Sequence, residues 1–145
     1  MPKQDRNLVD GLFQLSFLLQ ARLSRVAAEH HLSVAQVRLL GILRDREPGM
    51  LELARHLELE KSSLSGLVDR AEKRGLVERI PSPKDRRAAT IRVTAQGRKL
   101  SRVVAEAVTA EVNVLVRAFP ETERKRLAAL LWRLVPESEA GARAS

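Results

Sequence analysis

The sequence predicts a mainly α-helical fold with one small β-hairpin, of the α+β class. Aromatic residues make up only 3% of its 145 residues, so a core must be built from aliphatic side chains, as in many helical proteins. Apolar residues recur with the period of a helix face along most of the chain. Two short β-branched runs, at 77–80 and 90–93, interrupt this pattern once and predict a pair of strands. The length suits about one domain.

The first predicted helix spans residues 8–26. Its apolar side chains are spaced three or four residues apart, at Leu8, Leu12, Leu15, Leu19, Leu23 and Val26. Because so apolar a helix must be covered, we expect another surface to pack on it. The longest uncharged stretch here, 11–21, is too short to cross a membrane, and we expect a cytoplasmic protein.

Three shorter helices follow. Ser33 and Gln36 have the spacing of a capping box, which predicts a helix that ends before the Pro-Gly pair at 48–49. A third helix is predicted over 51–57 and a fourth over 61–71.

The fourth helix has an apolar face and a polar face. The inner face carries Leu64, Leu67, Val68 and Ala71. The outer face carries Lys61, Ser62, Ser65, Asp69 and Arg70. Serines and a lysine at the leading end let a helix approach base edges and phosphates closely. Two short helices of this kind are typical of a helix-turn-helix, and a generic pair of antiparallel helices is the alternative. Gly75 suits the left-handed conformation that ends such a helix.

The two β-branched runs flank a basic loop at 81–88. Over 91–93 an arginine alternates with Ile and Val, which predicts a strand with one buried and one exposed face. A helix-turn-helix followed at once by a hairpin is a winged helix, and a cationic wing can reach the phosphate backbone or the minor groove of DNA. Asp85 lies two residues from Arg87 and can accept hydrogen bonds that orient its guanidinium.

The net charge of +8 also favours a polyanionic partner. Between residues 61 and 92, nine Lys and Arg residues outnumber four Asp and Glu residues, a surplus of +5. A charge run is often only a solvated surface, but this one coincides with the helix-turn-helix and the wing. We therefore expect double-stranded DNA as the partner.

At these positions the sequence resembles the MarR family (multiple antibiotic resistance regulators) of dimeric winged-helix transcription factors. The resemblance is strongest over 52–97. The motifs that carry it are Glu52-Leu53-Ala54, Lys61-Ser62-Ser63-Leu64, Leu67-Val68-Asp69-Arg70, Lys73-Arg74-Gly75-Leu76-Val77-Glu78-Arg79, Asp85-Arg86-Arg87 and Val93-Thr94-Ala95-Gln96-Gly97.

The resemblance implies roles for parts of this chain. In the family, the helix that matches 61–74 reads the major groove, and the arginine that matches Arg87 enters the minor groove, supported by the aspartate that matches Asp85. Family members often have a polar cap where this chain has Met50 and Leu51. A phosphate contact at that helix start is therefore not carried over.

The terminal segments are predicted to form a dimerisation unit. Thr94 is the expected cap of a long helix with apolar residues at Leu100, Val103, Val104, Ala107, Val108, Val112, Leu115 and Phe119. Pro120 permits a last helix, which ends at Pro136. Because these segments carry more apolar surface than one monomer can hide, a two-fold dimer is expected. The expected divisions are dimerisation helices at 1–32 and 95–136, a DNA-binding lobe at 33–94 and a disordered tail at 137–145.

These features predict a sequence-specific transcriptional regulator, a repressor that a small molecule releases from an inverted-repeat operator. The resemblance implies an aromatic or lipophilic anion as effector, bound between the dimer helices and the DNA-binding lobe. Candidates to lie near it are Arg22, Arg25, Arg38 and Trp132. No cofactor is expected. The residues expected at the DNA are Lys61, Ser62, Ser63, Ser65, Arg70, Arg79, Lys84, Asp85, Arg86 and Arg87.

Other classes of function find less support in the sequence. An enzyme needs a convergent set of reactive groups, whereas this chain has three histidines, no cysteine and no tyrosine. The lack of cysteine also excludes disulfides and thiolate metal sites. A zinc-responsive regulator of the same fold could use Glu29, His30, His31 and His56, although adjacent helical histidines point in different directions. A winged helix that binds only protein is a further alternative, which failure to bind duplex DNA at low salt would favour.

Overall fold

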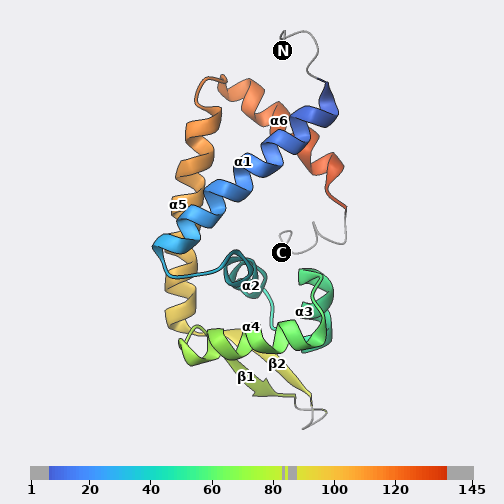
Figure 1. Cartoon of the computed structure of the whole chain (residues 1–145), viewed down its shortest axis with the longest axis vertical. Helices are drawn as coiled ribbons and strands as arrows, with labels where there is room; N and C mark the ends of the chain where they lie inside the picture. The colour runs from blue at the N-terminus through green and yellow to red at the C-terminus, as the bar shows by residue number, and fades with distance from the viewer. Residues whose placement is uncertain (1–6, 83, 85–87, 137–145) are drawn as a thin grey trace.

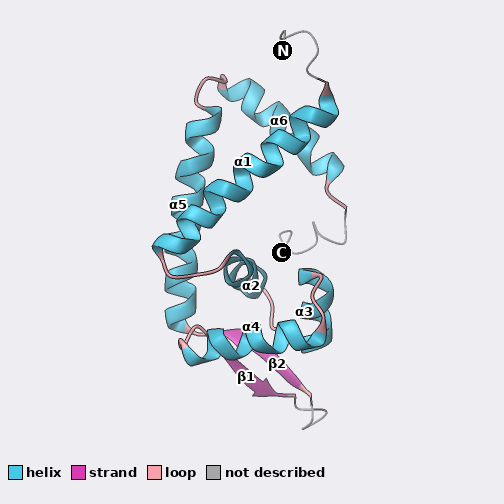
Figure 2. Cartoon of the chain, in the orientation of Figure 1, coloured by secondary structure: helices cyan, strands magenta, loops and turns pink. Residues whose placement is uncertain are grey.

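The computed structural model describes residues 7–82, 84 and 88–136, and it confirms the predicted fold class (Figure 1, Figure 2). Figure 1 shows α1, α5 and α6 gathered at one end of the molecule, and α2, α3, α4 and the hairpin at the other. The long helix α5 runs between the two ends. The elements in chain order are α1 (Leu8–Glu29), α2 (Val34–Leu43), α3 (Met50–Leu57), α4 (Lys61–Lys73), β1 (Val77–Pro81), β2 (Ala89–Val93), α5 (Ala95–Val116) and α6 (Glu121–Leu134).

Two of the predicted helix caps are formed by side chains. Ser33 Oγ accepts a hydrogen bond from the N–H of Gln36 at 3.1 Å, and Gln36 Oε1 accepts one from the N–H of Ser33 at 2.9 Å, which completes the capping box of α2. Thr94 Oγ1 accepts from the N–H of Gly97 at 3.0 Å and caps α5. The same hydroxyl donates to the carbonyl of Gly75 at 2.6 Å, so the start of α5 is bound to the turn after α4.

The helix ends differ in part from the prediction. Gly75 has φ of +74°, as expected after α4. His31 and Glu58 also have positive φ, 56° and 52°, although neither is a glycine. The apolar pattern of the fifth helix extended to Phe119, but α5 ends at Val116. Phe119 lies in the turn before α6, because the proline that follows it cannot continue a helical hydrogen-bond ladder.

The hairpin is fixed to the helix-turn-helix along one edge. β1 and β2 pair antiparallel, with Val77 opposite Val93. Ile91 and Val93 are buried and Arg92 is exposed, which confirms the predicted alternation. The N–H of Ile91 also donates to the carbonyl of Pro48 at 2.8 Å, so the segment before α3 lies against the free edge of β2.

The core lies in the lobe made by α2, α3, α4 and the hairpin. Its largest fully buried side chains are Leu39, Leu43, Leu53, Leu64, Leu67, Leu76, Ile91, Val68 and Val77. By contrast, α1 buries only Val26 and Ala27, and α6 buries no residue. The core is therefore centred in the lobe and extends to Val26 and Ala27 of α1 and Val104 of α5, whereas α1 and α6 leave most of their apolar faces open.

Candidate nucleic-acid interface

Helix α4 lies next to the hairpin (Figure 1), and the exposed side of its first turn is polar. Its inner residues Leu64, Leu67, Val68 and Ala71 are at most 2% exposed, which fixes the rotation of the helix. Lys61, Ser62 and Ser63 are therefore exposed on the first turn, and Ser65 is half-buried. In the described part of the chain no side chain caps α4, so its first N–H groups are open to an anion such as a phosphate.

Two arginines expected at the DNA lie in different surroundings. Arg79 of β1 is held by α4: its Nη2 donates to Asp69 Oδ1 at 2.7 Å and its Nη1 to Glu72 Oε1 at 3.1 Å. Arg79 therefore joins the wing to α4, a role that the sequence analysis missed. Arg70 is exposed and has no carboxylate partner among the described residues, and its Nη1 lies 3.1 Å from the place of a Cβ on Gly66. Its side chain thus extends back along α4.

The tip of the hairpin carries the remaining predicted contacts. Lys84 is exposed, and its N–H donates to Ser82 Oγ at 3.4 Å. The N–H of Ser82 donates to the carbonyl of Ala88 at 2.8 Å and closes the base of the loop. The orienting role expected of the aspartate at the tip stays a prediction. The residues it involves lie outside those that the structure describes: Asp85, Arg86 and Arg87.

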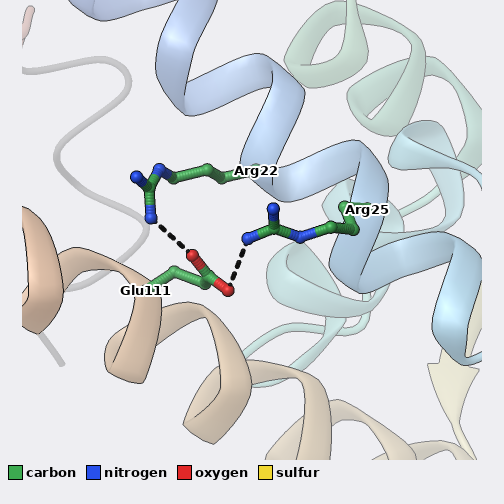
Figure 3. A network of polar contacts seen from close by, with 3 residues as sticks. All are labelled: Arg22, Arg25 and Glu111. Atoms are coloured by element: carbon green, nitrogen blue, oxygen red, sulfur yellow. Dashed lines mark hydrogen bonds and ion pairs between the residues drawn. The ribbon is translucent and has the colours of Figure 1, made fainter.

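Away from the DNA-binding lobe, three charged side chains join α1 to α5 (Figure 3). The carboxylate of Glu111 accepts a hydrogen bond from Arg22 Nη1 and another from Arg25 Nη2, each at 2.7 Å. Hydrogen bonds from Arg25 and Arg22 hold the pKa of the Glu111 carboxyl below its usual value. Arg22 and Arg25, which were expected near an effector, are thus bound to a carboxylate between the two helices.

A cavity of about 470 Å³ lies between α1, α2 and α5. Of the four residues expected near an effector, Arg38 lines it, whereas Arg22, Arg25 and Trp132 are not among its lining residues. Arg38 also donates to the carbonyl of His56 at 3.4 Å. The aliphatic part of the lining comes from Leu23, Val37, Leu40, Ile42, Val104 and Val108.

The residues of the zinc alternative do not gather. His30 and His31 follow the end of α1, whereas His56 of α3 has its Nε2 3.0 Å from Arg46 Nη1 and 3.7 Å from Glu52 Oε1. Across residues 7–82, 84 and 88–136, no three His, Asp or Glu side chains are placed to hold a metal ion. The geometry therefore adds no support to a zinc site.

Apolar side chains cover exposed faces of α1 and α6, and each of those named here is at least 39% exposed. Those of α1 are Leu8, Val9, Leu12, Phe13, Leu15, Phe17, Leu18 and Leu19. Those of α6 are Leu127, Leu130, Leu131, Trp132 and Leu134. Even so, none of the helices in the described residues is long and apolar enough to cross a bilayer.

A helix-turn-helix core with an attached hairpin defines a winged-helix protein, a DNA-binding fold. Residues 30–88 match the model of the MarR family. The HTH-type transcriptional regulator PecS of Dickeya dadantii (strain 3937) is 33% identical over 132 residues, which cover 88% of this chain and 79% of PecS. The HTH-type transcriptional regulator FarR of Neisseria gonorrhoeae is 26% identical over 145 residues, 97% of this chain and 98% of FarR.

Solved structures agree with this fold. Wild-type apo MarR from E. coli has a TM-score of 0.78 and 22% identity, covering 90% of this chain and 98% of that one. The transcriptional repressor CouR, bound to a 23-mer DNA duplex, has a TM-score of 0.77 and 23% identity, and the match covers 92% of this chain and 96% of CouR. The chain belongs to the MarR family. It is a transcriptional regulator with a DNA-binding fold and not an enzyme.

Proposed function

We propose that the chain binds an inverted-repeat operator as a homodimer, represses transcription there, and is released by a small-molecule effector. The observation that carries the proposal is the placement of α4 beside the wing. The first turn of α4 is exposed and polar, its inner face is buried, and Arg79 binds the wing to it. With this arrangement α4 can enter the major groove while the wing reaches the flanking backbone or minor groove.

The proposed contacts fall into three groups. Lys61, Ser62, Ser63 and Ser65 stand at the leading end of α4, where base edges and nearby phosphates are within reach. Positively charged side chains of α4 and of the wing segment would bind phosphates or the minor groove, and these are Arg70, Lys84, Arg86 and Arg87. Asp85 would orient Arg87, and Arg79 would act through the position of the wing.

Alanine at Ser62 and at Ser65 tests the reading role of α4. We expect each lost specific contact to weaken binding to the cognate operator by about 1–3 kcal/mol and to leave non-specific binding nearly unchanged. An equal loss on cognate and unrelated DNA, measured by fluorescence anisotropy, would mean that these serines only anchor the backbone.

The operator itself tests the two-fold symmetry. Two copies of α4 related by a two-fold axis should contact half-sites about 10 base pairs apart, or a multiple of this. Selection of bound fragments from genomic DNA should therefore yield inverted repeats. A single asymmetric half-site in the strongest fragments, protected by one protomer, would contradict the proposal.

The dimer is proposed to form through the segments 1–32 and 95–136, with 33–94 as the DNA-binding lobe. Exposed apolar faces on α1 and α6 support this division. Phe13→Glu should therefore give monomers or unfolded chain in sedimentation velocity runs. Leu51→Glu is the control, because Leu51 is 70% exposed, more than Phe13 at 60%, yet lies on α3. A fully dimeric Phe13→Glu protein would place the interface elsewhere.

The effector is proposed to bind in the cavity of about 470 Å³ between α1, α2 and α5. This cavity separates the proposed dimerisation helices from the lobe, so a ligand there can change the angle between them. Its volume is in the range usual for small-molecule sites. Substitutions that fill this cavity should therefore weaken the binding of a compound that releases operator DNA.

A further inference from the structure

The side chain of Arg74 joins the end of α4 to the end of α1. Arg74 Nη1 donates to the backbone carbonyl of His31 at 2.6 Å, and Arg74 Nη2 donates to that of His30 at 3.3 Å. Both carbonyls lie in the turn that follows α1. In Figure 1 the ends of α1 and α4 lie on the same side of the molecule, at the left of the view. One guanidinium group therefore connects two helices that are far apart in the sequence.

The turn after α1 offers carbonyl groups that suit a cation. The N–H of Leu32 donates to the carbonyl of Ala27 at 2.8 Å, and the N–H of His31 donates to that of Ala28 at 3.0 Å. With His31 at φ of 56°, this is a Schellman motif. The carbonyl end of a helix carries partial negative charge, and the last turn of α1, residues 26–29, includes no lysine or arginine. Arg74 supplies the missing cation from another helix.

The backbone of Arg74 is itself fixed in place. Arg74 is the residue at which α4 ends, and the N–H of Leu76 donates to the carbonyl of Ala71 at 3.0 Å to close the turn after it. The next residue, Gly75, has its carbonyl bound by the Thr94 hydroxyl at the start of α5. Because the backbone of Arg74 cannot shift easily, its two side-chain bonds fix the distance between the end of α4 and the end of α1.

A phosphate contact is the alternative role for an exposed arginine on this helix. Arg74 follows Lys61 by 13 positions, so it lies about 20 Å along α4 from the end proposed to read bases. Both of its terminal nitrogens donate to backbone carbonyls. These two observations favour a role in positioning α4 over a role in binding DNA directly.

We infer that Arg74 is a positioning residue for operator binding, which fixes where the two copies of α4 stand in the dimer. The inference rests on the proposed function, in which α1 belongs to the dimerisation unit and α4 reads the operator. A bond from α4 to the end of α1 then sets the distance of α4 from the two-fold axis. Half-sites at one fixed spacing require one such distance. Without the bond, α4 samples several positions, and its ordering must be completed on binding.

Operators with altered spacing test this role on the full chain. The probes are the operator selected from genomic DNA and two versions with one base pair inserted or removed between the half-sites. Each change moves one half-site by about 3.4 Å and turns it by about a tenth of a helical turn. Arg74→Gln should weaken binding to the original operator about three- to tenfold, because it removes charged hydrogen bonds at an exposed site. Binding to the altered operators should weaken less, so the ratio of the affinities should fall at least about twofold.

Two further variants separate positioning from charge. Lys73→Gln is the matched control, since it removes the same charge from the neighbouring residue, whose side chain has no hydrogen bond or ion pair with another described residue. It should keep the wild-type ratio between the original and altered operators. Arg74→Lys should restore part of the ratio, because an ammonium group can donate to one of the two carbonyls. A smaller folded fraction lowers affinity equally at every spacing and does not change the ratio.

The outcomes distinguish this inference from the proposed function. A wild-type chain with no preferred spacing would overturn the proposed inverted-repeat binding and the inference with it. If the wild type prefers one spacing and Arg74→Gln keeps the same ratio, the inference alone is overturned. It is also overturned if Lys73→Gln lowers the ratio as much as Arg74→Gln. Equal weakening at all three spacings, with a salt slope lower by about one unit, would instead make Arg74 a phosphate contact.

Discussion

Gly97 permits the close approach of α5 to the turn that leads into the wing, and its replacement by alanine is our most sharply defined stability prediction. A Cβ on Gly97 would lie 2.0 Å from the carbonyl oxygen of Leu76 and 2.9 Å from the carbonyl carbon of that residue. It would also lie 2.9 Å from Cγ2 of Val93. Two of these three atoms belong to the backbone, so no side-chain rotation can relieve the contact. Gly97→Ala must therefore move α5 away from the wing.

Two opposing effects set the size of this change. Alanine is favoured over glycine in a helix by at most about 1 kcal/mol. Overpacking costs about 1–3 kcal/mol, and loss of the bond from the N–H of Thr94 to the Leu76 carbonyl, now 3.0 Å long, costs about 1 kcal/mol more. The net loss is about 1–3 kcal/mol. A Cβ added at Gly41 meets no atom within 4 Å, so Gly41→Ala should instead stabilise the folded chain by about 0.5–1 kcal/mol.

Urea and thermal unfolding, followed by far-ultraviolet circular dichroism, measure both variants at one protein concentration, since the stability of the proposed dimer depends on it. With about 2–4 °C of melting temperature per kcal/mol for a chain of this size, the two variants should separate by several degrees in opposite directions. A Gly97→Ala protein as stable as Gly41→Ala would refute the reasoning. It would mean that α5 is not closely packed against the wing.

Four further predictions concern charged groups. Arg25 and Arg22 lower the pKa of Glu111 in the folded chain. The contribution of this carboxylate to the free energy of unfolding is therefore present above the unfolded pKa near 4.5, and it is lost as the pH falls through the lower folded pKa. Glu111→Gln should therefore make the urea midpoint less sensitive to acid below pH 4.5, and an unchanged sensitivity would argue against the contact. Arg79→Lys should cost less than about 1 kcal/mol of stability, because the ion pairs of Arg79 are partly exposed. It should nevertheless reduce operator affinity, because the wing is held less firmly on α4. Unchanged operator affinity would exclude a positioning role for Arg79. Arg87→Ala should weaken DNA binding and lower the salt slope by about one unit. Asp85→Asn should also weaken DNA binding if Asp85 orients Arg87. Tighter DNA binding by this variant would mean that the wing acts only through its positive charge.

The elements that the sequence predicted well depend on local patterns. The capping box of Ser33 and Gln36, the Thr94 cap and the left-handed Gly75 each involve residues within a few positions of one another. The buried and exposed alternation around Arg92 is local in the same sense. Such features need no knowledge of how distant elements pack.

What the sequence did not predict depends on packing between distant segments. Arg79 was expected at the DNA because it is a cation beside the wing, but the docking of β1 on α4 places it against Asp69 and Glu72. Asp69 and Glu72 are three residues apart on one exposed helix face, and this spacing in the sequence could have indicated a binding site for an arginine. The contact of Glu111 with two arginines of α1 joins residues 86 and 89 positions apart, and no periodicity identifies such a pair.

The position of α5 explains how a ligand in the cavity would reach the DNA. The wing end of α5 cannot slide, because the Thr94 hydroxyl binds the carbonyl of Gly75 at 2.6 Å and Gly97 abuts the backbone of Leu76. Its other part is tied to α1 through Glu111. Between these attachments α5 packs on α2, and the cavity lies along this contact, between side chains that a ligand can separate. A ligand there would push α2 away from α5. Because α2 shares the buried core of α3 and α4, the reading helix would turn with it about the fixed wing end of α5. Gly97→Ala loosens that fixed end and is therefore expected to lower operator affinity as well as stability.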